Sequence, residues 1–188
     1  MERNSSLGYK RYAECLNDLM DYFILADIEL LTQFQQTHDL SYDLLTEFTT
    51  TDSGDTAVRD GVILPLAGIE NHPYTVYFTL DAASVFDSEI KQSDLQRHQS
   101  GYLVQVISQR LYLFTMPILR RWPNFMTVVT AHKPFIDVDN GWYQVTVRAG
   151  ETLQESGWEP TIEFHLCPQD TKPELLADTS YRFQITRA

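Results

Sequence analysis

The alternation of apolar and polar side chains is clearest in the stretch Asp139-Asn140-Gly141-Trp142-Tyr143-Gln144-Val145-Thr146-Val147-Arg148. From Tyr143 to Val147 every second residue is apolar, which is the period of a β-strand with one buried face. The Asn140-Gly141 pair before it supplies the positive φ angles that a tight hairpin turn needs. We therefore predict a hairpin that joins a strand at Phe135–Val138 to a strand at Trp142–Arg148.

The same two-residue period recurs elsewhere beyond Gly61 and predicts further strands, each rich in β-branched and aromatic residues. These predicted strands are Thr75–Leu80, Tyr102–Val106, Thr161–Leu166 and Tyr181–Ile185. The run Leu111–Phe114 fits either a strand or the start of a helix, and Pro117 and Pro123 favour a strand followed by one short helix. Residues 88–99 are polar, and we expect them to form a helical or looped connection.

The first sixty residues show a longer period. Apolar residues recur every three or four positions over Tyr9–Phe34, which predicts one long amphipathic helix. A second helical pattern covers Leu40–Phe48 and ends in residues 49–55, whose small polar side chains favour a turn or a loop. The predicted fold class is therefore α+β, with an N-terminal helical layer packed on a mainly antiparallel β-sheet.

The size and composition of the chain are those of an ordinary globular protein. Its 188 residues are 43% hydrophobic and 21% charged, which is enough apolar material for a well-formed core. We expect a single domain over 1–188, with a helical part at 1–50 and a β-rich part at 61–188. The sequence opens without an apolar leader, and its apolar runs are too short to span a bilayer, so we expect a cytoplasmic protein.

Negative charge is concentrated in the first half of the chain. Residues 1–100 contain 17 Asp and Glu against 6 Lys and Arg, residues 101–188 contain 9 against 8, and the net charge is −12. Such a surface repels nucleic acid and lipid and attracts a basic partner, although it can also serve solubility alone. The candidate partner-binding residues are Glu14, Asp18, Asp21, Glu29, Asp39, Asp43, Glu47, Asp52 and Asp55. Asp27 and Asp60 belong to the same acidic run.

No motif for a reaction or a cofactor stands out in the sequence. The eight glycines do not form a phosphate-binding loop, and no serine lies in a Gly-x-Ser-x-Gly motif. Only His165 and Cys167 bring two types of metal ligand close together, whereas structural zinc takes four. We therefore expect no catalytic residue, no metal and no cofactor. Cys15 and Cys167 are expected to be reduced thiols in the core.

Two parts of the sequence resemble known proteins. One leads from Gly61–Leu66 to Tyr74–Phe78, and the other joins the arm Gly141–Val147, which begins Gly-Trp-Tyr, to Ile162–Leu166. The Gly-Trp-Tyr arm is similar to that of small acidic bacterial inhibitor proteins, among them competence-type nuclease inhibitors and the immunity proteins encoded beside polymorphic or secreted antibacterial toxins. The resemblance implies a class, a cytosolic antitoxin that blocks a toxin, and it transfers no site residue.

The acidic surface and this resemblance together predict a non-enzymatic inhibitor. It would be an immunity protein that binds the basic domain of a cognate toxin and covers the toxin's active site, with no nucleic-acid or membrane partner. Its carboxylates would fill pockets that hold phosphate in the toxin. Two other interpretations stay open, namely a hydrolase that uses two carboxylates as acid and base, and a β-rich module that binds a small molecule.

Overall fold

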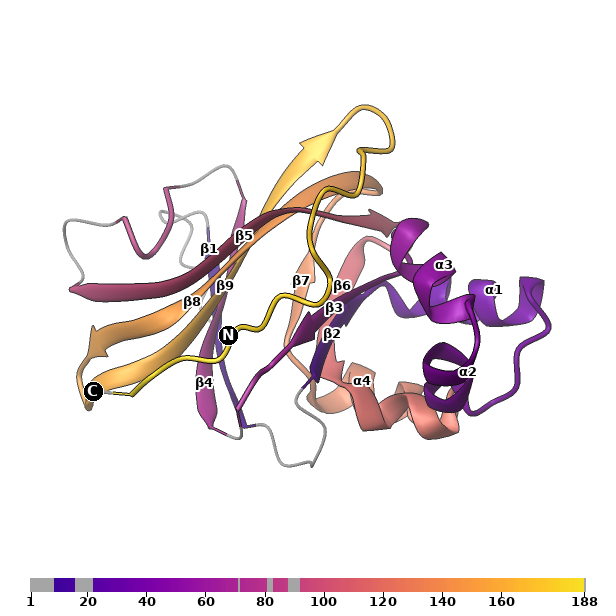
Figure 1. Cartoon of the computed structure of the whole chain (residues 1–188), viewed down its shortest axis with the longest axis horizontal. Coiled ribbons are helices and arrows are strands. Elements are labelled where there is room, and N and C mark those ends of the chain that lie inside the picture. Colours follow the sequence, from indigo (N-terminus) through magenta and orange to yellow (C-terminus); the bar gives the residue numbers. More distant parts are fainter. Residues whose placement is uncertain (1–8, 16–21, 71, 81–82, 88–91, 188) are drawn as a thin grey trace.

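The computed structural model in Figure 1 describes residues 9–15, 22–70, 72–80, 83–87 and 92–187. Its elements in chain order are β1 (Tyr9–Cys15), β2 (Tyr22–Ala26), α1 (Ile28–Thr37), α2 (Leu44–Thr50), α3 (Ser53–Arg59), β3 (Ile63–Ala67), β4 (Pro73–Leu80), β5 (Ser93–Val106), β6 (Arg110–Thr115), the 3₁₀ helix η1 (Met116–Arg121), α4 (Met126–His132), β7 (Phe135–Asp137), β8 (Gly141–Gln154) and β9 (Gly157–Gln169). In the described part of the chain, no helix is long and apolar enough to cross a membrane.

The strands form two sheets. The five-stranded sheet has the order β1-β4-β9-β8-β5, and the four-stranded sheet has the order β3-β2-β6-β7. Strands β4 and β9 run parallel, whereas the other neighbours are antiparallel. The predicted α+β class is therefore confirmed, with mixed sheets that are mostly antiparallel.

The four-stranded sheet is the middle layer of the molecule. Alternate side chains of β2 point to opposite faces, so Phe23 and Leu25 belong to the core shared with the five-stranded sheet, and Ile24 and Ala26 pack with the helices. Figure 1 shows α1 to α4 gathered beyond this sheet, at the end of the molecule away from the C-terminus. The helices thus cover the face of the four-stranded sheet that the other sheet leaves open.

The long helix predicted over Tyr9–Phe34 is wrong. Strands β1 and β2 occupy the described residues of its first part, and α1 begins only at Ile28. Residues 16–21 of the predicted helix lie outside the described residues. Strand β2 is buried on both faces, so its run Phe23–Ala26 is apolar without alternation, and such a run fits a helical pattern as well as a buried strand.

The second predicted helix is confirmed as α2, but a further helix follows where a turn or loop was predicted. Helix α3 begins at Ser53, inside the segment 49–55. Asp55 lies in its first turn and Arg59 in its last, and both charges interact favourably with the helix dipole. The small polar residues therefore begin a helix, and the prediction of a turn or loop over 49–55 is wrong for the part that starts at Ser53.

The predicted Asn-Gly hairpin is wrong, because the strands before and after this turn do not pair with each other. Strand β7 pairs with β6, whereas β8 pairs with β5 and β9 in the other sheet. The Asn140-Gly141 pair lies where the chain crosses from one sheet to the other. The Asn140 Oδ1 atom accepts a hydrogen bond from the backbone N–H of Gln109 at 2.8 Å, and the Tyr143 hydroxyl donates to the carbonyl of Asp139 at 2.8 Å. These bonds fix the crossing.

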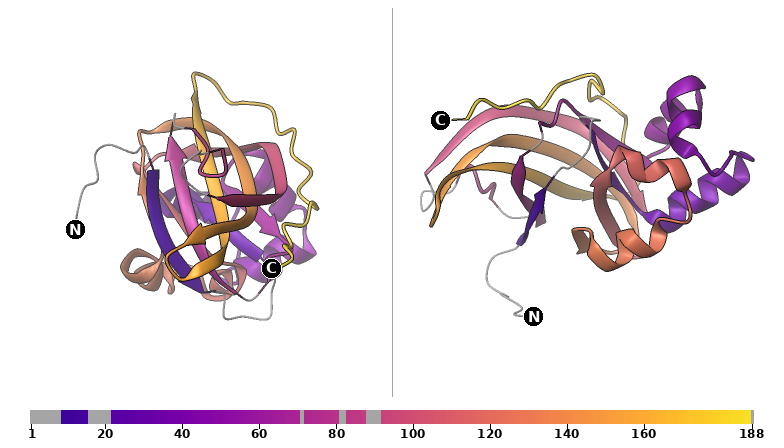
Figure 2. Two further views of the ribbon diagram at one scale, coloured as in Figure 1. Left: turned by 90° about the vertical axis from the view of Figure 1, so that its left-hand side faces the viewer. Right: turned by 90° about the horizontal axis from the view of Figure 1, so that it is seen from below.

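The other strand predictions have mixed outcomes. Strands β4, β5 and β9 contain three of the predicted segments. The prediction of a strand at Leu111–Phe114 followed by one short helix is confirmed by β6 and η1. Residues 93–99, expected in a helical or looped connection, form the first half of β5. The segment Tyr181–Ile185 is not a strand apart from one bridge between Arg182 and Ala67. Its alternation arises because Phe183 and Ile185 are buried, and Figure 2 shows this C-terminal segment running along the sheets.

Candidate functional site

The segment 28–60, which contains α1, α2 and α3, is named here the acidic helical end. It holds seven acidic residues and one basic residue, Arg59, and its net charge of −6 is half of the −12 of the whole chain. Figure 1 shows these helices together at one end of the molecule. The negative charge is therefore concentrated on one end of the fold, where its field can steer a basic partner.

Four carboxylates of the acidic helical end are exposed to solvent, namely Glu29, Asp39, Asp52 and Asp55. No ion pair between described residues includes any of them. Asp52 occupies the cap position of α3, but its side chain makes no capping hydrogen bond. The four charges are thus not neutralised by a described cation of the chain itself.

Two other predicted residues, Asp43 and Glu47, are half-buried and serve the local structure. Asp43 caps α2, because its Oδ1 atom accepts a hydrogen bond from the Thr46 N–H at 3.1 Å. Hydrogen bonds from the Thr46 N–H and hydroxyl lower the pKa of Asp43, and the guanidinium of Arg120 lowers it further. Glu47 accepts a hydrogen bond from the Ser41 N–H at 3.1 Å. These two carboxylates support the helices that carry the exposed ones.

The structure does not gather the nine predicted residues on one helix. The backbone of Glu14 lies in strand β1, on another element from the helices, and Asp18 and Asp21 lie outside the described residues. The acidic helical end brings together the remaining six, which are Glu29, Asp39, Asp43, Glu47, Asp52 and Asp55. Asp60, at the end of this segment, forms an ion pair with Lys172 at 3.0 Å.

The carboxylate of Asp27 is fully buried, although the sequence placed it in the acidic run. Its Oδ1 atom caps α1 by accepting hydrogen bonds from the N–H groups of Glu29 and Leu30 and from the Ser108 hydroxyl. Its Oδ2 atom accepts from the N–H groups of Ile107 and Ser108, both at 2.7 Å. Asp27 therefore ties α1 to the turn between β5 and β6 and is not part of a docking surface.

A second buried carboxylate, Glu163, lies on the outer face of the five-stranded sheet. It accepts hydrogen bonds from the Thr79 and Ser84 hydroxyls at 3.2 and 2.6 Å and from the Val85 N–H at 3.0 Å. The Arg148 guanidinium pairs with it at 3.1 Å. The charge of this buried carboxylate is compensated within the fold by a cation and three further donors, whereas a general acid or base needs access to substrate. Glu163 was not among the residues predicted from the sequence to bind a partner.

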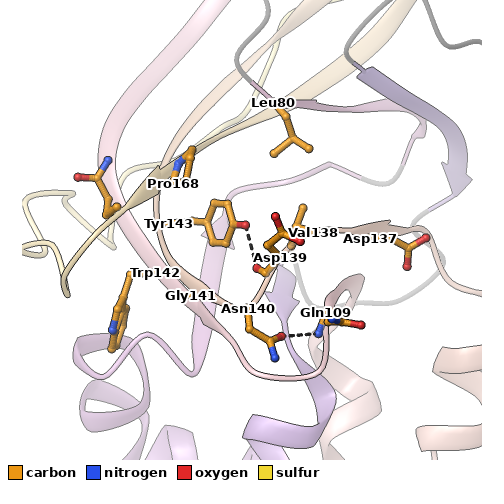
Figure 3. Close-up of a pocket in the computed structure, with 11 residues that line it drawn as sticks. Leu80, Gln109, Asp137, Val138, Asp139, Asn140, Gly141, Trp142, Tyr143 and Pro168 are labelled. Carbon is orange, nitrogen blue, oxygen red and sulfur yellow. Dashed lines mark hydrogen bonds between the residues drawn. The ribbon is translucent and has the colours of Figure 1, made fainter.

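Two hollows lie beside the turn between β5 and β6, and the second of them borders the acidic helical end. The first, of about 520 Å³, lies at the crossing from β7 to β8, and Figure 3 shows Leu80, Tyr143 and Asp139 around it. The second, of about 350 Å³, lies beside the first turn of α1 and is lined by Glu29 and Arg110 among others. Gln109 and Asp137 line both hollows.

The described residues hold no group of three or more His, Cys, Asp or Glu side chains that could bind a metal ion. Cys167 is a free thiol and is exposed, so the expectation of a core position for it is wrong. It lies on β9 one strand position beyond the last buried residue, Leu166, where the outer face of the sheet is open. The side chain of Cys15 is outside the described part.

Comparison with known proteins gives similarity only among solved structures. No protein-family model and no curated protein matches the chain. The similar structures include the crystal structure of ComJ, an inhibitor of the DNA-degrading activity of NucA, from Bacillus subtilis, with 10% identity and a TM-score of 0.45 over 85% of this chain and 96% of that chain. They also include the product of crocagin biosynthetic gene J, with 13% identity and a TM-score of 0.47 over 87% and 99%.

A nuclease inhibitor is among the solved structures that resemble this chain, and the Gly-Trp-Tyr arm was likened to proteins of that class. This arm, Gly141–Val147, lies in β8, between β5 and β9. It is a structural strand of the five-stranded sheet, and the carboxylates described above lie on other elements.

Proposed function

We propose that this chain is a non-enzymatic inhibitor that binds a basic protein through its acidic helical end. The observation that carries the proposal is the exposure of Glu29, Asp39, Asp52 and Asp55 without a neutralising cation among the described residues. An uncompensated surface of one sign raises the rate of encounter with a partner of the other sign and selects against partners of like charge.

The partner that fits this surface best is the basic effector domain of a cognate toxin. A domain that acts on nucleic acid or nucleotides carries Lys and Arg side chains for phosphate groups. Carboxylates of the inhibitor can occupy the same positions and so cover the active site of the toxin. The chain would then act as an immunity protein in the cytoplasm of the cell that makes the toxin. The resemblance of the Gly141–Val147 arm to small acidic inhibitors supports the same class.

A titration of toxin activity tests this function. The chain is expressed with the protein encoded by the neighbouring gene, and the activity of that protein is measured at increasing ratios of chain to toxin. An inhibitor that occludes an active site abolishes activity at about one equivalent, and the loss is reversed at high salt because the contact is electrostatic. Protection at far below one equivalent would contradict the proposal and would favour the hydrolase that reverses a modification.

A further inference from the structure

Residues 175–187, named here the strap, cross the edges of both sheets (Figure 1). Strand β5 is an outer strand of the five-stranded sheet, and β3 is an outer strand of the four-stranded sheet. The N–H groups of residues 176–177 donate hydrogen bonds to the carbonyl of Gly101 in β5 at 2.9 and 3.1 Å. The N–H of Phe183 donates to the carbonyl of Ala67 in β3 at 2.9 Å. The strap therefore covers two strand edges at which another chain could otherwise pair.

Two glutamine side chains of β5 bind the backbone of the strap. The Nε2 atom of Gln96 donates to the carbonyl of Thr186 at 2.8 Å, and its Oε1 atom accepts from the N–H of Thr186 at 2.7 Å. Gln99 makes the same pair of bonds with the backbone of Asp178, at 2.8 and 3.3 Å. Each glutamine thus binds both backbone groups of one strap residue, as a neighbouring strand would. These contacts select an extended backbone.

The apolar side chains of the strap fill the core between the sheets. Phe183 and Ile185 are two positions apart, so they point to the same side of an extended segment. They are 0% and 3% exposed and belong to the core cluster that both sheets share. An extended backbone held by polar groups, with alternate side chains in apolar pockets, is the way in which proteins bind a peptide at a sheet edge.

Two glycines make room for the strap. Gly68 and Gly101 have φ angles of 70° and 89°, and a Cβ atom at either position would lie too close to the strap. It would be 2.7 Å from the Cβ of Arg182 at Gly68 and 2.8 Å from the Cβ of Leu176 at Gly101. The site that holds the strap is named here the strap groove, and it comprises Ala67, Gly68, Gln96, Gln99 and Gly101.

The strap is joined to β9 by the linker 170–174, which contains Pro173 and forms no helix or strand. In this linker Lys172 forms an exposed ion pair with Asp60 at 3.0 Å, and an ion pair of this kind adds little stability. The contacts between the strap and the strap groove do not involve the linker. The strap of another copy of the chain can therefore make the same contacts, which is the basis of segment exchange between identical chains.

We propose that the strap groove is a peptide-binding site, and that a second copy of the chain fills it with its own strap when the resident strap is released. The charge of the strap supports this occupant. Two Arg and one Asp give the strap a net charge of +1, whereas the whole chain carries −12. Arg187, near the end of the strap, lies 3.8 Å from the buried carboxylate of Glu151. The groove lies outside the acidic helical end, so its occupancy does not depend on the proposed function.

Peptide binding to the full chain tests the site. The variant Phe183→Ala loosens the resident strap, and the probe is a fluorescein-labelled peptide with the sequence of residues 175–187. Fluorescence anisotropy measures binding. We expect the peptide to bind the variant at least about tenfold more tightly than wild type, in which the tethered strap competes at high effective concentration. The peptide that itself carries Phe183→Ala should bind the variant at least about tenfold more weakly than the unchanged peptide.

Leu153→Ala is the matched control, because Leu153 is an exposed apolar residue outside the strap and the strap groove. It should bind the peptide no more tightly than wild type. Circular dichroism reports whether each variant is folded, and Ile185→Ala replaces Phe183→Ala if the latter is unfolded. No binding, equal binding to wild type and the loosened variant, or equal binding of the two peptides would overturn the site.

Mixing two complementary variants tests the second copy as the occupant. One is Phe183→Ala, which keeps the groove intact, and the other combines Gln96→Ala and Gln99→Ala, which keeps the strap intact. Sedimentation velocity should show a dimer in the mixture that neither variant forms alone. No dimer in the mixture, or the same dimer in either variant alone, would overturn exchange of the strap. Since no toxin is used, this result is separate from the activity titration, and either proposal can fail alone.

Discussion

Carboxylates that are buried beside the sheets and carboxylates of the acidic helical end have different surroundings in this protein. Glu163 and Asp27 are fully buried, and each accepts four or five hydrogen bonds from donors that belong to several elements. Asp39 and Asp55 are exposed, and no ion pair among described residues includes them. One residue type therefore serves folding in the first region and remains free for a partner in the second.

The comparison shows that burial decides the role of an acidic residue more than its place in the charge pattern does. Asp27 and Glu29 are two positions apart and belong to the same acidic run, yet Asp27 is a buried cap and Glu29 is an exposed residue that lines the smaller hollow. A buried charge is tolerated only when it is bonded, whereas an exposed one costs the fold little. Substitutions of buried carboxylates should therefore destabilise the fold far more than substitutions of exposed ones.

The largest loss of stability is expected for Glu163→Ala. The substitution leaves the guanidinium of Arg148 and the N–H of Val85 without their acceptor, and breaking a buried ion pair costs about 3 to 5 kcal/mol. Urea unfolding followed by tryptophan fluorescence measures the change. The matched variant Glu155→Ala, at an exposed turn residue, should change the free energy of unfolding by less than about 0.5 kcal/mol. Equal losses of unfolding free energy in the two variants would contradict the difference between buried and exposed carboxylates.

Asp27→Ala should cost about 3 kcal/mol, because it removes the cap of α1 and leaves the N–H groups of the turn between β5 and β6 unsatisfied. The same unfolding experiment compares it with Glu29→Ala, for which the expected loss is below about 0.5 kcal/mol. Hydrogen exchange of the amides of Ile107 and Ser108 should accelerate in the Asp27 variant only. A Glu29 variant as unstable as the Asp27 variant would contradict the assignment of roles.

Asp43 is a half-buried helix cap, and its contribution to the free energy of unfolding should depend on pH. Asp43→Ala removes a cap and should cost about 1 kcal/mol at neutral pH. The pKa of Asp43 is lowered in the folded chain, chiefly by the Thr46 N–H, so the carboxylate stabilises the fold above the ordinary pKa of 3.8. This contribution is lost as the pH falls through the lowered pKa. Unfolding measured at pH 7 and below pH 3 should show the difference between wild type and variant shrinking with acid.

The smallest effect on stability is expected when the four exposed carboxylates are neutralised together. This helical variant combines Glu29→Gln, Asp39→Asn, Asp52→Asn and Asp55→Asn. It should change the free energy of unfolding by no more than about 1 kcal/mol, because each charge is solvated and self-repulsion is reduced. Thermal unfolding provides the measurement, and a large loss would show that these carboxylates hold the fold together.

Much of the fold follows from the sequence where one face of a strand is buried. The alternation over Tyr143–Val147 predicts β8, and that over Thr161–Leu166 predicts the centre of β9. The run Phe23–Ala26 does not alternate because both faces of β2 are covered, by the other sheet and by the helices. The Asn140-Gly141 pair predicts a change of direction, but pairing is set by contacts far along the chain, and β8 pairs with β5.

The candidate site is predictable only in its charge. Composition places an excess of carboxylates in the first half, but the sequence contains no sign that Asp27 contacts Ser108, which lies 81 positions later. An Asp followed by the first helical residue Ile28 is a capping signal, and it would have identified Asp27 once the start of α1 was known. Glu163 carries a weaker signal, an acid inside an apolar strand, and the segment with Ser84 that covers it comes from 79 positions earlier.

The decisive experiment for the acidic helical end measures the rate at which the chain associates with the toxin used in the activity titration. Stopped-flow rates at low ionic strength are compared for wild type, the helical variant and a control variant. The control variant removes four exposed carboxylates outside the acidic helical end by Asp87→Asn, Asp94→Asn, Glu155→Gln and Glu174→Gln. We predict that the helical variant associates at least about tenfold more slowly than wild type, and that the rate of the control variant falls by a much smaller factor. Equal rates for the helical variant and wild type, or equal losses in the two variants, would contradict this prediction.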